Sequence, residues 1–240
     1  MMRKHISLLV SALVMTMAVS AQAGEVSVLG GLDMTGITSN PVPEGMTLSN
    51  ATKFTFGADY NHAFASNWSL EVGLFYQNKG NKYTTAGIEY TAIAKSITTP
   101  VMVRYSVLPQ YLSLGVGAFT SFGVGSVNIV ETPGKTYDET YEKVGSAKFD
   151  YGVVGGLRAS YPVFQGLDVI GDVRYYLGLK NLNTDPTDPN TTEKSKDIAV
   201  LVGVRYALSS QNLYPISEGE ERISLPFFIC EDQRSLKALR

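Results

Sequence analysis

The sequence is poor in the residues that build most metal and redox sites. Its 240 residues include one cysteine, two histidines and one tryptophan, and only 18% are charged. One cysteine cannot close an internal disulfide, and with two histidines it cannot form a zinc site of the usual ligands. A formal net charge of -2 lacks the basic excess of nucleic-acid-binding proteins. We therefore expect no metal site, no cofactor and no nucleic-acid partner.

Long apolar runs are missing after the first two dozen residues. The chain starts with Arg3 and Lys4, continues with the apolar run ISLLVSALVMTMAV and reaches a small-x-small site, AQA, before Gly24. This order is typical of a cleaved bacterial signal peptide, and the run is shorter than the roughly 20 residues of a membrane-spanning helix. We predict export with removal of residues 1–23, and no transmembrane helix in the remainder. An uncleaved anchor is the alternative.

What the sequence does contain, from Gly24 onward, is alternation with a period of two residues. Eight segments carry an uncharged row of apolar and aromatic side chains at every second position, which is the pattern of a strand with one apolar face. They cover residues 26–34, 54–60, 68–76, 99–107, 112–122, 149–161, 167–177 and 198–208. The chain is predicted to be all-β, with residues 24–208 as one domain.

The opposite face of these strands carries the charges, with acids and bases nearly matched. We group the following as a predicted lumen charge network: Lys53, Asp59, Glu71, Arg104, Asp150, Arg158, Asp172, Arg174 and Arg205. In a soluble barrel the apolar face points inward, whereas in an outer-membrane barrel it faces lipid and charges fill the lumen. Periodicity does not choose between the two. A charge left unpaired in such an interior would cost several kcal/mol, so the arginines need carboxylates nearby.

Three features favour the membrane barrel. Aromatic residues lie beside the short connections, as in an interfacial girdle; these are Tyr60, Trp68, Tyr105, Tyr111, Tyr161 and Tyr206. Brief turns alternate with four long loops, expected at residues 35–51, 78–96, 125–147 and 180–196. An even number of strands closes a ring with no edge in hydrocarbon. We predict an eight-stranded antiparallel up-and-down transmembrane β-barrel with short turns in the periplasm and long loops outside.

Three motifs in the second half of the chain resemble one known family. They are TPVMVRY at 99–105, FDYGVVGGL at 149–157 and GDVRYYLGLKN at 171–181. Each is similar to a strand signature of the small porin-like outer-membrane β-barrel proteins, the OmpA/OmpX-type superfamily. The resemblance implies the outer membrane of a Gram-negative bacterium, contact with outer-membrane lipid and lipopolysaccharide, and insertion by the outer-membrane assembly machinery. We expect a monomer. Pro100 cannot donate to a ladder, so we expect it near a strand end or at a bulge, toward the external rim.

Catalysis has little support in the sequence. Some eight-stranded outer-membrane barrels modify lipid A with His and Ser residues near the outer leaflet, but His62 is expected beside a periplasmic turn. No G-x-S-x-G nucleophile elbow is present. We expect a non-catalytic barrel that serves envelope structure or surface interaction through its external loops, whose partner is unknown. The alternatives are a narrow channel for small solutes and a lipid-modifying enzyme.

Residues 209–240 depart from the family pattern. Family members commonly stop at an aromatic residue of the last strand, whereas here the chain continues past Tyr206 with mixed charge and includes Cys230. We predict a periplasmic, poorly ordered tail. An interaction segment and a reading-frame artefact remain open as explanations.

Overall fold

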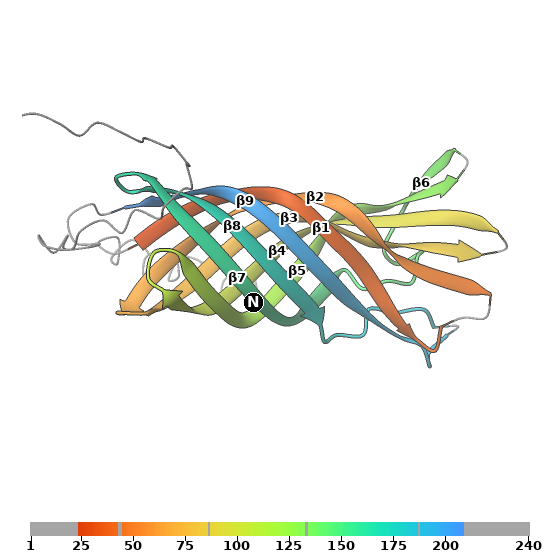
Figure 1. Ribbon diagram of the computed structural model, residues 1–240. Helices are drawn as coiled ribbons and strands as arrows, with labels where there is room; N and C mark the ends of the chain where they lie inside the picture. Colours follow the sequence, from red (N-terminus) through yellow and green to blue (C-terminus); the bar gives the residue numbers. More distant parts are fainter. Residues whose placement is uncertain (1–23, 43–44, 86, 133, 187, 209–240) are drawn as a thin grey trace, which may run out of the picture.

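The computed structural model describes residues 24–42, 45–85, 87–132, 134–186 and 188–208. The predicted signal peptide at 1–23 and the predicted tail at 209–240 lie outside the described residues. All named elements of the described chain are β-strands (Figure 1). Among these residues, none belongs to a helix with the length and apolar character needed to cross a membrane.

Eight long strands form a closed antiparallel ring (Figure 1). They are β1 (Gly24–Asn40), β2 (Met46–Ala65), β3 (Trp68–Thr85), β4 (Ile88–Leu108), β5 (Leu112–Thr132), β7 (Phe149–Phe164), β8 (Leu167–Gly178) and β9 (Thr192–Ala207). Each ring strand pairs with the next, and β1 pairs with β9 to close the ring. The short β6 (Lys135–Glu139) pairs with β5 alone. The predicted eight-stranded up-and-down barrel is confirmed, with β6 as an added hairpin strand.

The apolar rows of the strands face outward and the charges face inward. Val116 on β5 is 68% exposed and Val202 on β9 is 66% exposed, whereas Arg174 on β8 is 0% exposed. A continuous apolar belt of this kind is unfavourable in water. A closed barrel is compatible with lipid because it leaves no strand edge with unpaired backbone N–H and C=O groups. The distribution therefore fits a barrel whose outer solvent is lipid.

The strands continue well beyond the apolar belt at one end. β3 and β4 stay paired as far as Thr85 and Ile88. β5 runs to Thr132, and its residues 127–131 are paired with β6. The expectation of long loops at 35–51, 78–96 and 125–147 is therefore wrong for most of these residues. Apolar alternation stops where a strand leaves the lipid, although backbone hydrogen bonding between the strands continues. Periodicity therefore underestimated the length of the strands. Residues 179–191 do form a long connection, between β8 and β9.

The rings predicted as an interfacial girdle lie at the end of the barrel that carries the short turns. Trp68 and Tyr105 are cross-strand partners with ring centroids 4.9 Å apart. Tyr111, Tyr161 and Tyr206 are exposed, while Tyr60 is half-buried and stacks on His62. Their interfacial role stays a prediction.

A second group of rings, not predicted, lies toward the opposite end of the belt. It comprises Phe54, Phe56, Tyr76, Phe122, Phe149 and Tyr151, and we call it the upper aromatic group. Trp68 and Tyr76 are eight residues apart on β3, which is about 26 Å along a strand at about 3.3 Å per residue. Strand tilt reduces the separation along the barrel axis to about 20 Å, which is close to the height of the apolar band of outer-membrane barrels. The spacing fits the interpretation that the two groups of rings lie at the limits of the belt.

Pro100 lies in the middle of β4, so the expectation of a position at the external rim is wrong. It pairs with Phe119 of β5. On the β3 side the ladder is interrupted, because no pair is formed between Val72–Val101 and Phe75–Thr98. A Cβ on Gly73 would lie 3.1 Å from the Pro100 ring. A proline is tolerated here because the ladder on the β3 side is interrupted and a glycine faces the ring.

Candidate functional site: a buried charge cluster in the lumen

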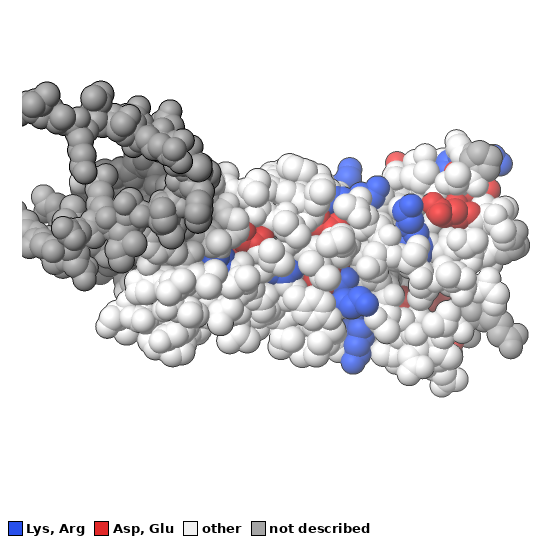
Figure 2. Space-filling view, viewed as in Figure 1, with Lys and Arg blue, Asp and Glu red and all other residues white. Residues whose placement is uncertain are grey.

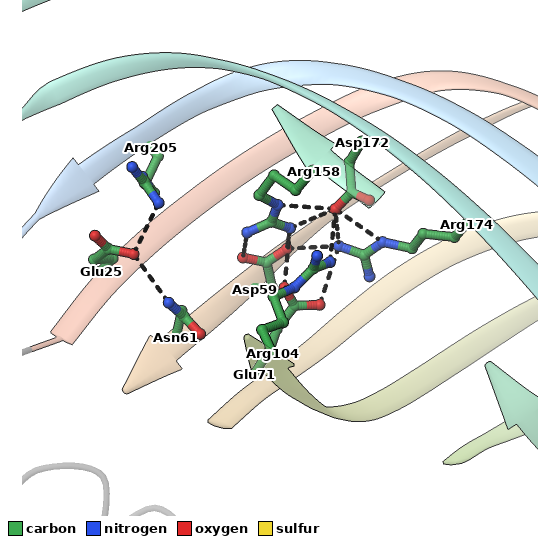
Figure 3. A network of polar contacts seen from close by, with 9 residues as sticks. All are labelled: Glu25, Asp59, Asn61, Glu71, Arg104, Arg158, Asp172, Arg174 and Arg205. Carbon is green, nitrogen blue, oxygen red and sulfur yellow. Dashed lines mark hydrogen bonds and ion pairs between the residues drawn. The ribbon is translucent and has the colours of Figure 1, made fainter. Parts of the chain in front are cut away.

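Six charged residues meet near the middle of the lumen (Figure 3). Asp59 comes from β2, Glu71 from β3, Arg104 from β4, Arg158 from β7, and Asp172 and Arg174 from β8; we call them the lumen cluster. Their side chains are at most 2% exposed. Three guanidinium groups face three carboxylates, so the formal charges cancel.

Asp172 is the centre of this cluster. Its Oδ2 lies 3.0 Å from Arg104 Nη2, 2.7 Å from Arg158 Nη2 and 2.9 Å from Arg174 Nη2. Arg174 and Arg158 each donate a second hydrogen bond to this oxygen through Nε. One carboxylate oxygen thus joins arginines from three strands.

The other two carboxylates complete the network across the barrel. Arg158 Nη2 lies 2.6 Å from Asp59 Oδ2, and Arg104 Nε donates to Glu71 Oε2 at 2.5 Å. Arg174 Nη2 reaches both carboxylates, at 2.9 Å from Asp59 and 3.1 Å from Glu71. Strands on opposite sides of the ring are therefore cross-linked by charge-assisted hydrogen bonds, which are stronger than neutral ones.

Neighbouring residues shape the space for these arginines. A Cβ on Gly115 would lie 3.0 Å from Arg104 Cγ and 2.9 Å from Met102 Cε, so glycine at this position leaves room for both side chains. The Arg174 guanidinium lies 4.5 Å from the centre of the Phe75 ring, a cation–π contact. The cluster is packed as well as paired.

An apolar layer separates the lumen cluster from a second charged group. The layer contains Leu29, Phe75, Met102, Phe119, Val154, Ile170, Tyr176, Ala199 and Leu201. Beyond it, Lys79 Nζ lies 3.0 Å from Asp197 and 4.0 Å from Asp150, and Ser195 Oγ donates to Asp150 at 2.6 Å. The Lys79 ammonium also lies 4.7 Å from the Phe119 ring centre.

A third charged group lies at the short-turn end. Arg205 Nη1 is 3.2 Å from Glu25 Oε2, and Arg205 Nε donates to Asp168 at 3.0 Å. Asn61 donates to the same Glu25 oxygen at 3.0 Å. These side chains are 14–20% exposed, so this group is wetter than the lumen cluster.

The structure divides the predicted charge network among these groups. Six of the nine residues form the lumen cluster, whereas Asp150 belongs with Lys79 and Arg205 with Glu25 and Asp168. Lys53 is half-buried opposite Asp33 in the ladder and is in no ion pair among the described residues. The apolar layer keeps Asp150 apart from the lumen cluster, and the cavity at the short-turn end lies between the cluster and Arg205, so a single network does not form.

Lys79 and Asp197 were missed by the sequence reasoning. Lys79 falls in the segment expected to be a loop at 78–96, and Asp197 precedes the last predicted strand by one residue. The signal was present, since Glu71, Phe75 and Lys79 follow one parity along β3.

Two cavities lie on either side of the closed middle. One of about 280 Å³ opens at the short-turn end and is lined by Arg104, Arg158 and Arg205 among others. The other, of about 80 Å³, lies at the far end beside Lys79 and Tyr141. Tyr141 is 9% exposed and its hydroxyl donates to the Lys95 carbonyl at 3.3 Å. Burial raises the pKa of this hydroxyl, which stays neutral.

The carboxylates of the lumen cluster suit arginine better than a metal ion. Oxygens of Asp59, Glu71 and Asp172 lie within 4.8 Å of one another. All three accept hydrogen bonds or ion pairs from the arginines, which would repel a cation at the same place. The arrangement is a structural cross-link rather than a coordination site.

A family model agrees with this architecture. Residues 20–183 match the model described as outer membrane protein beta-barrel domain. The chain belongs to this family. Its members are integral outer-membrane proteins of the Gram-negative type. In such barrels short turns face the periplasm and longer connections the outside, and this orientation stays the prediction for the present chain. No curated protein matches the chain.

Several solved structures of outer-membrane proteins are similar to the chain at low sequence identity. OprG from Pseudomonas aeruginosa is 14% identical over 77% of this chain and 96% of its own, with a TM-score of 0.47. Ail of Yersinia pestis, in complex with a heparin analogue, is 12% identical over 76% and 99%, with a TM-score of 0.40. The outer membrane protease OmpT from Escherichia coli is 12% identical over 78% and 97%, with a TM-score of 0.38. Similarity at this level extends to a protease, so it carries no conclusion about activity.

Proposed function

We propose that this protein is a non-catalytic, non-conducting barrel that anchors a surface for interaction in the outer membrane. The observation that carries the proposal is the lumen cluster, which places three arginines and three carboxylates across the lumen with at most 2% exposure. An open path for solutes would need this cluster to separate. Separation would leave buried charges unpaired, at several kcal/mol each.

The cavities support a closed lumen. The short-turn cavity ends on Arg104 and Arg158, and the cavity at the other end is bounded by Lys79 and Tyr141. The apolar layer around Phe119 and Tyr176 lies between them. A solute entering from either end would meet packed side chains.

A lipid-modifying activity has no matching constellation in the described chain. His62 is the only histidine among the described residues. It lies near the periplasmic end and stacks on Tyr60, with the two ring centroids 6.4 Å apart. The lumen carboxylates are each held by arginine, which keeps them from acting as free bases. These placements favour a non-catalytic role.

The external hairpins are the proposed interaction surface. Tyr83 on β3 stacks on Tyr90 on β4 with ring centroids 5.1 Å apart, and Tyr137 on β6 is 42% exposed. Rigid aromatic side chains on paired strands offer contact area at little entropic cost. The external partner would bind here.

Conductance of the refolded protein in planar bilayers tests the proposal. We expect no reproducible unitary steps from the wild-type protein. A control variant with all six residues of the lumen cluster changed to serine, and with Phe75, Phe119 and Tyr176 of the apolar layer changed to alanine, shown to be folded by heat-modifiable gel mobility, should conduct and thereby show that the assay detects an opened lumen. Steps from the wild type would overturn the closed barrel. Altered lipid A masses in cells that express the protein would overturn the non-catalytic role.

A further inference from the structure

Five lysines lie just beyond the external limit of the apolar belt, four of them on the outer surface of the barrel and Lys148 at the rim of the 80 Å³ cavity, which it also lines. They are Lys95 on β4, Lys148 just before β7, Lys180 just after β8, and Lys194 and Lys196 on β9; we call them the lysine arc. Four are exposed and Lys180 is half-buried. Figure 2 shows basic side chains gathered in a band across the visible face of the barrel.

The lysine arc lies at the edge of the upper aromatic group. Lys95 is two residues outside Ile97, the ladder partner of Phe122, and Lys196 is two residues outside Ile198, the partner of Tyr175. Lys148 directly precedes Phe149, and Lys180 Nζ lies 5.3 Å from the Phe149 ring centre. In a barrel whose rings mark the end of the hydrocarbon, the next residues outward lie at the level of the lipid headgroups.

None of these five lysines is in an ion pair with a carboxylate among the described residues. Lysines farther from the membrane differ, because Lys82 pairs with Glu89 at 3.3 Å and Lys143 with Glu139 at 3.0 Å. Positive charge is therefore uncompensated by the protein at the headgroup level, whereas two of the three lysines above it, Lys82 and Lys143 but not Lys135, are paired among the described residues.

The arc covers one side of the barrel. Its lysines lie on or next to β4, β7, β8 and β9, which together with β5 are five consecutive positions of the ring. The remaining strands present exposed, uncharged residues at this level, such as Thr38, Asn50 and Thr52. Among the described residues, Arg205 is the one basic residue at the periplasmic rim, and it forms ion pairs with Glu25 and Asp168. The uncompensated charge is specific to one leaflet and one side.

We propose that the lysine arc binds the phosphate groups of lipid headgroups in the outer leaflet, held against the β4–β9 side of the barrel. Lysine ammonium groups near an anionic lipid surface each contribute favourably to association, by about fivefold in affinity per residue. The aromatic rings just below fix the depth of the barrel, so the ammonium groups stay at the level of the phosphates. The proposal does not depend on whether the lumen conducts.

Binding of diphosphorylated lipid A to the refolded full chain in neutral-detergent micelles tests the proposal. Two variants are matched in number and chemistry of substitutions. The arc variant combines Lys95→Gln, Lys148→Gln and Lys196→Gln, and the control variant combines Lys82→Gln, Lys135→Gln and Lys143→Gln, all beyond the headgroup level. Calorimetric titration measures the affinity of each, and heat-modifiable gel mobility checks that both are folded.

We expect the arc variant to lose at least tenfold in affinity and the control variant to lose less than threefold. Wild-type affinity should fall by a similar factor when the lipid is dephosphorylated. Equal losses in the two variants, or no dependence on the lipid phosphates, would overturn the proposal. Saturable binding of inorganic phosphate with the same affinity would assign the arc to a free anion instead of a lipid.

Discussion

The lumen cluster and the lysine arc use charge in opposite ways within one barrel. In the cluster every arginine contacts at least two carboxylates, and the six side chains are at most 2% exposed. In the arc, the lysines lie at the proposed level of the lipid headgroups and have no ion pair with a carboxylate among the described residues. The difference indicates that inward charges are satisfied by the fold itself, whereas the outward ones are left for something outside the protein.

The largest effect is expected from breaking the cluster. Arg174→Met leaves Asp59, Glu71 and Asp172 facing two arginines, with one buried negative charge in excess. We expect a loss of about 3–5 kcal/mol in the free energy of unfolding, since an uncompensated buried charge is the main cost. Urea unfolding of the refolded barrel in phospholipid micelles measures it.

A second substitution separates charge balance from lost packing. Adding Glu71→Leu to Arg174→Met restores equal numbers of positive and negative groups in the cluster. We expect the double variant to recover at least half of the loss, because apolar replacements of buried ion pairs are often tolerated. A double variant as unstable as the sum of its parts would show that the cluster acts through packing alone.

A smaller effect is expected at Lys79, which lies nearer the outer mouth. Lys79→Met removes the partner of Asp197 at 3.0 Å, while Asp150 keeps its hydrogen bond from Ser195. The side chain of Lys79 is 11% exposed, so water can partly replace it, and we expect about 2 kcal/mol. Adding Asp197→Asn should reduce the loss, and a cost equal to that of Arg174→Met would contradict the ordering by burial.

The membrane-spanning part of the fold was predictable because lipid imposes a period of two on every strand. The rows that include Val116, Val202 and Tyr206 define the strands and their apolar side, whereas the aromatic residues beside short turns and the even strand count were needed to predict a closed barrel facing lipid. The external hairpins were not predictable in this way. Their strands lie in water on both faces, so residues such as Thr84 and Glu89 carry no alternation although they pair in a regular ladder.

The lumen cluster was predictable as a set of inward charges and less so as a geometry. Parity places Asp59, Arg158 and Asp172 inside, but their levels along the barrel depend on register and strand tilt. Two neighbours on one strand, such as Asp172 and Arg174, can share a cluster, while Asp150 on β7 lies in another group beyond the apolar layer. Sequence spacing alone does not fix those levels.

The smallest effect on stability is expected at Glu193, a half-buried carboxylate at the external rim of the barrel. Glu193 lies on β9 beyond the lysine arc, and its backbone accepts from Leu182 N at 2.8 Å and donates to the Asn181 side chain at 2.9 Å. Burial raises the pKa of Glu193, and the nearby charge of Asp188 raises it further. Its ionised form therefore costs stability at neutral pH, and that cost disappears as the pH falls through the raised pKa.

Glu193→Gln should remove this cost at pH 7 and have no effect at pH 4, where the wild-type side chain is protonated. Because the group is partly exposed, solvent screening limits the gain to about 0.3 kcal/mol. Amide hydrogen exchange at Leu182, expressed as protection relative to the unfolded chain, measures it at both pH values. Glu142→Gln, on the exposed segment after β6, is the matched control and should leave protection unchanged. Faster exchange of the Glu193 variant at pH 7 would show instead that the carboxylate stabilises this connection, and that even the rim charges of the barrel are satisfied from within.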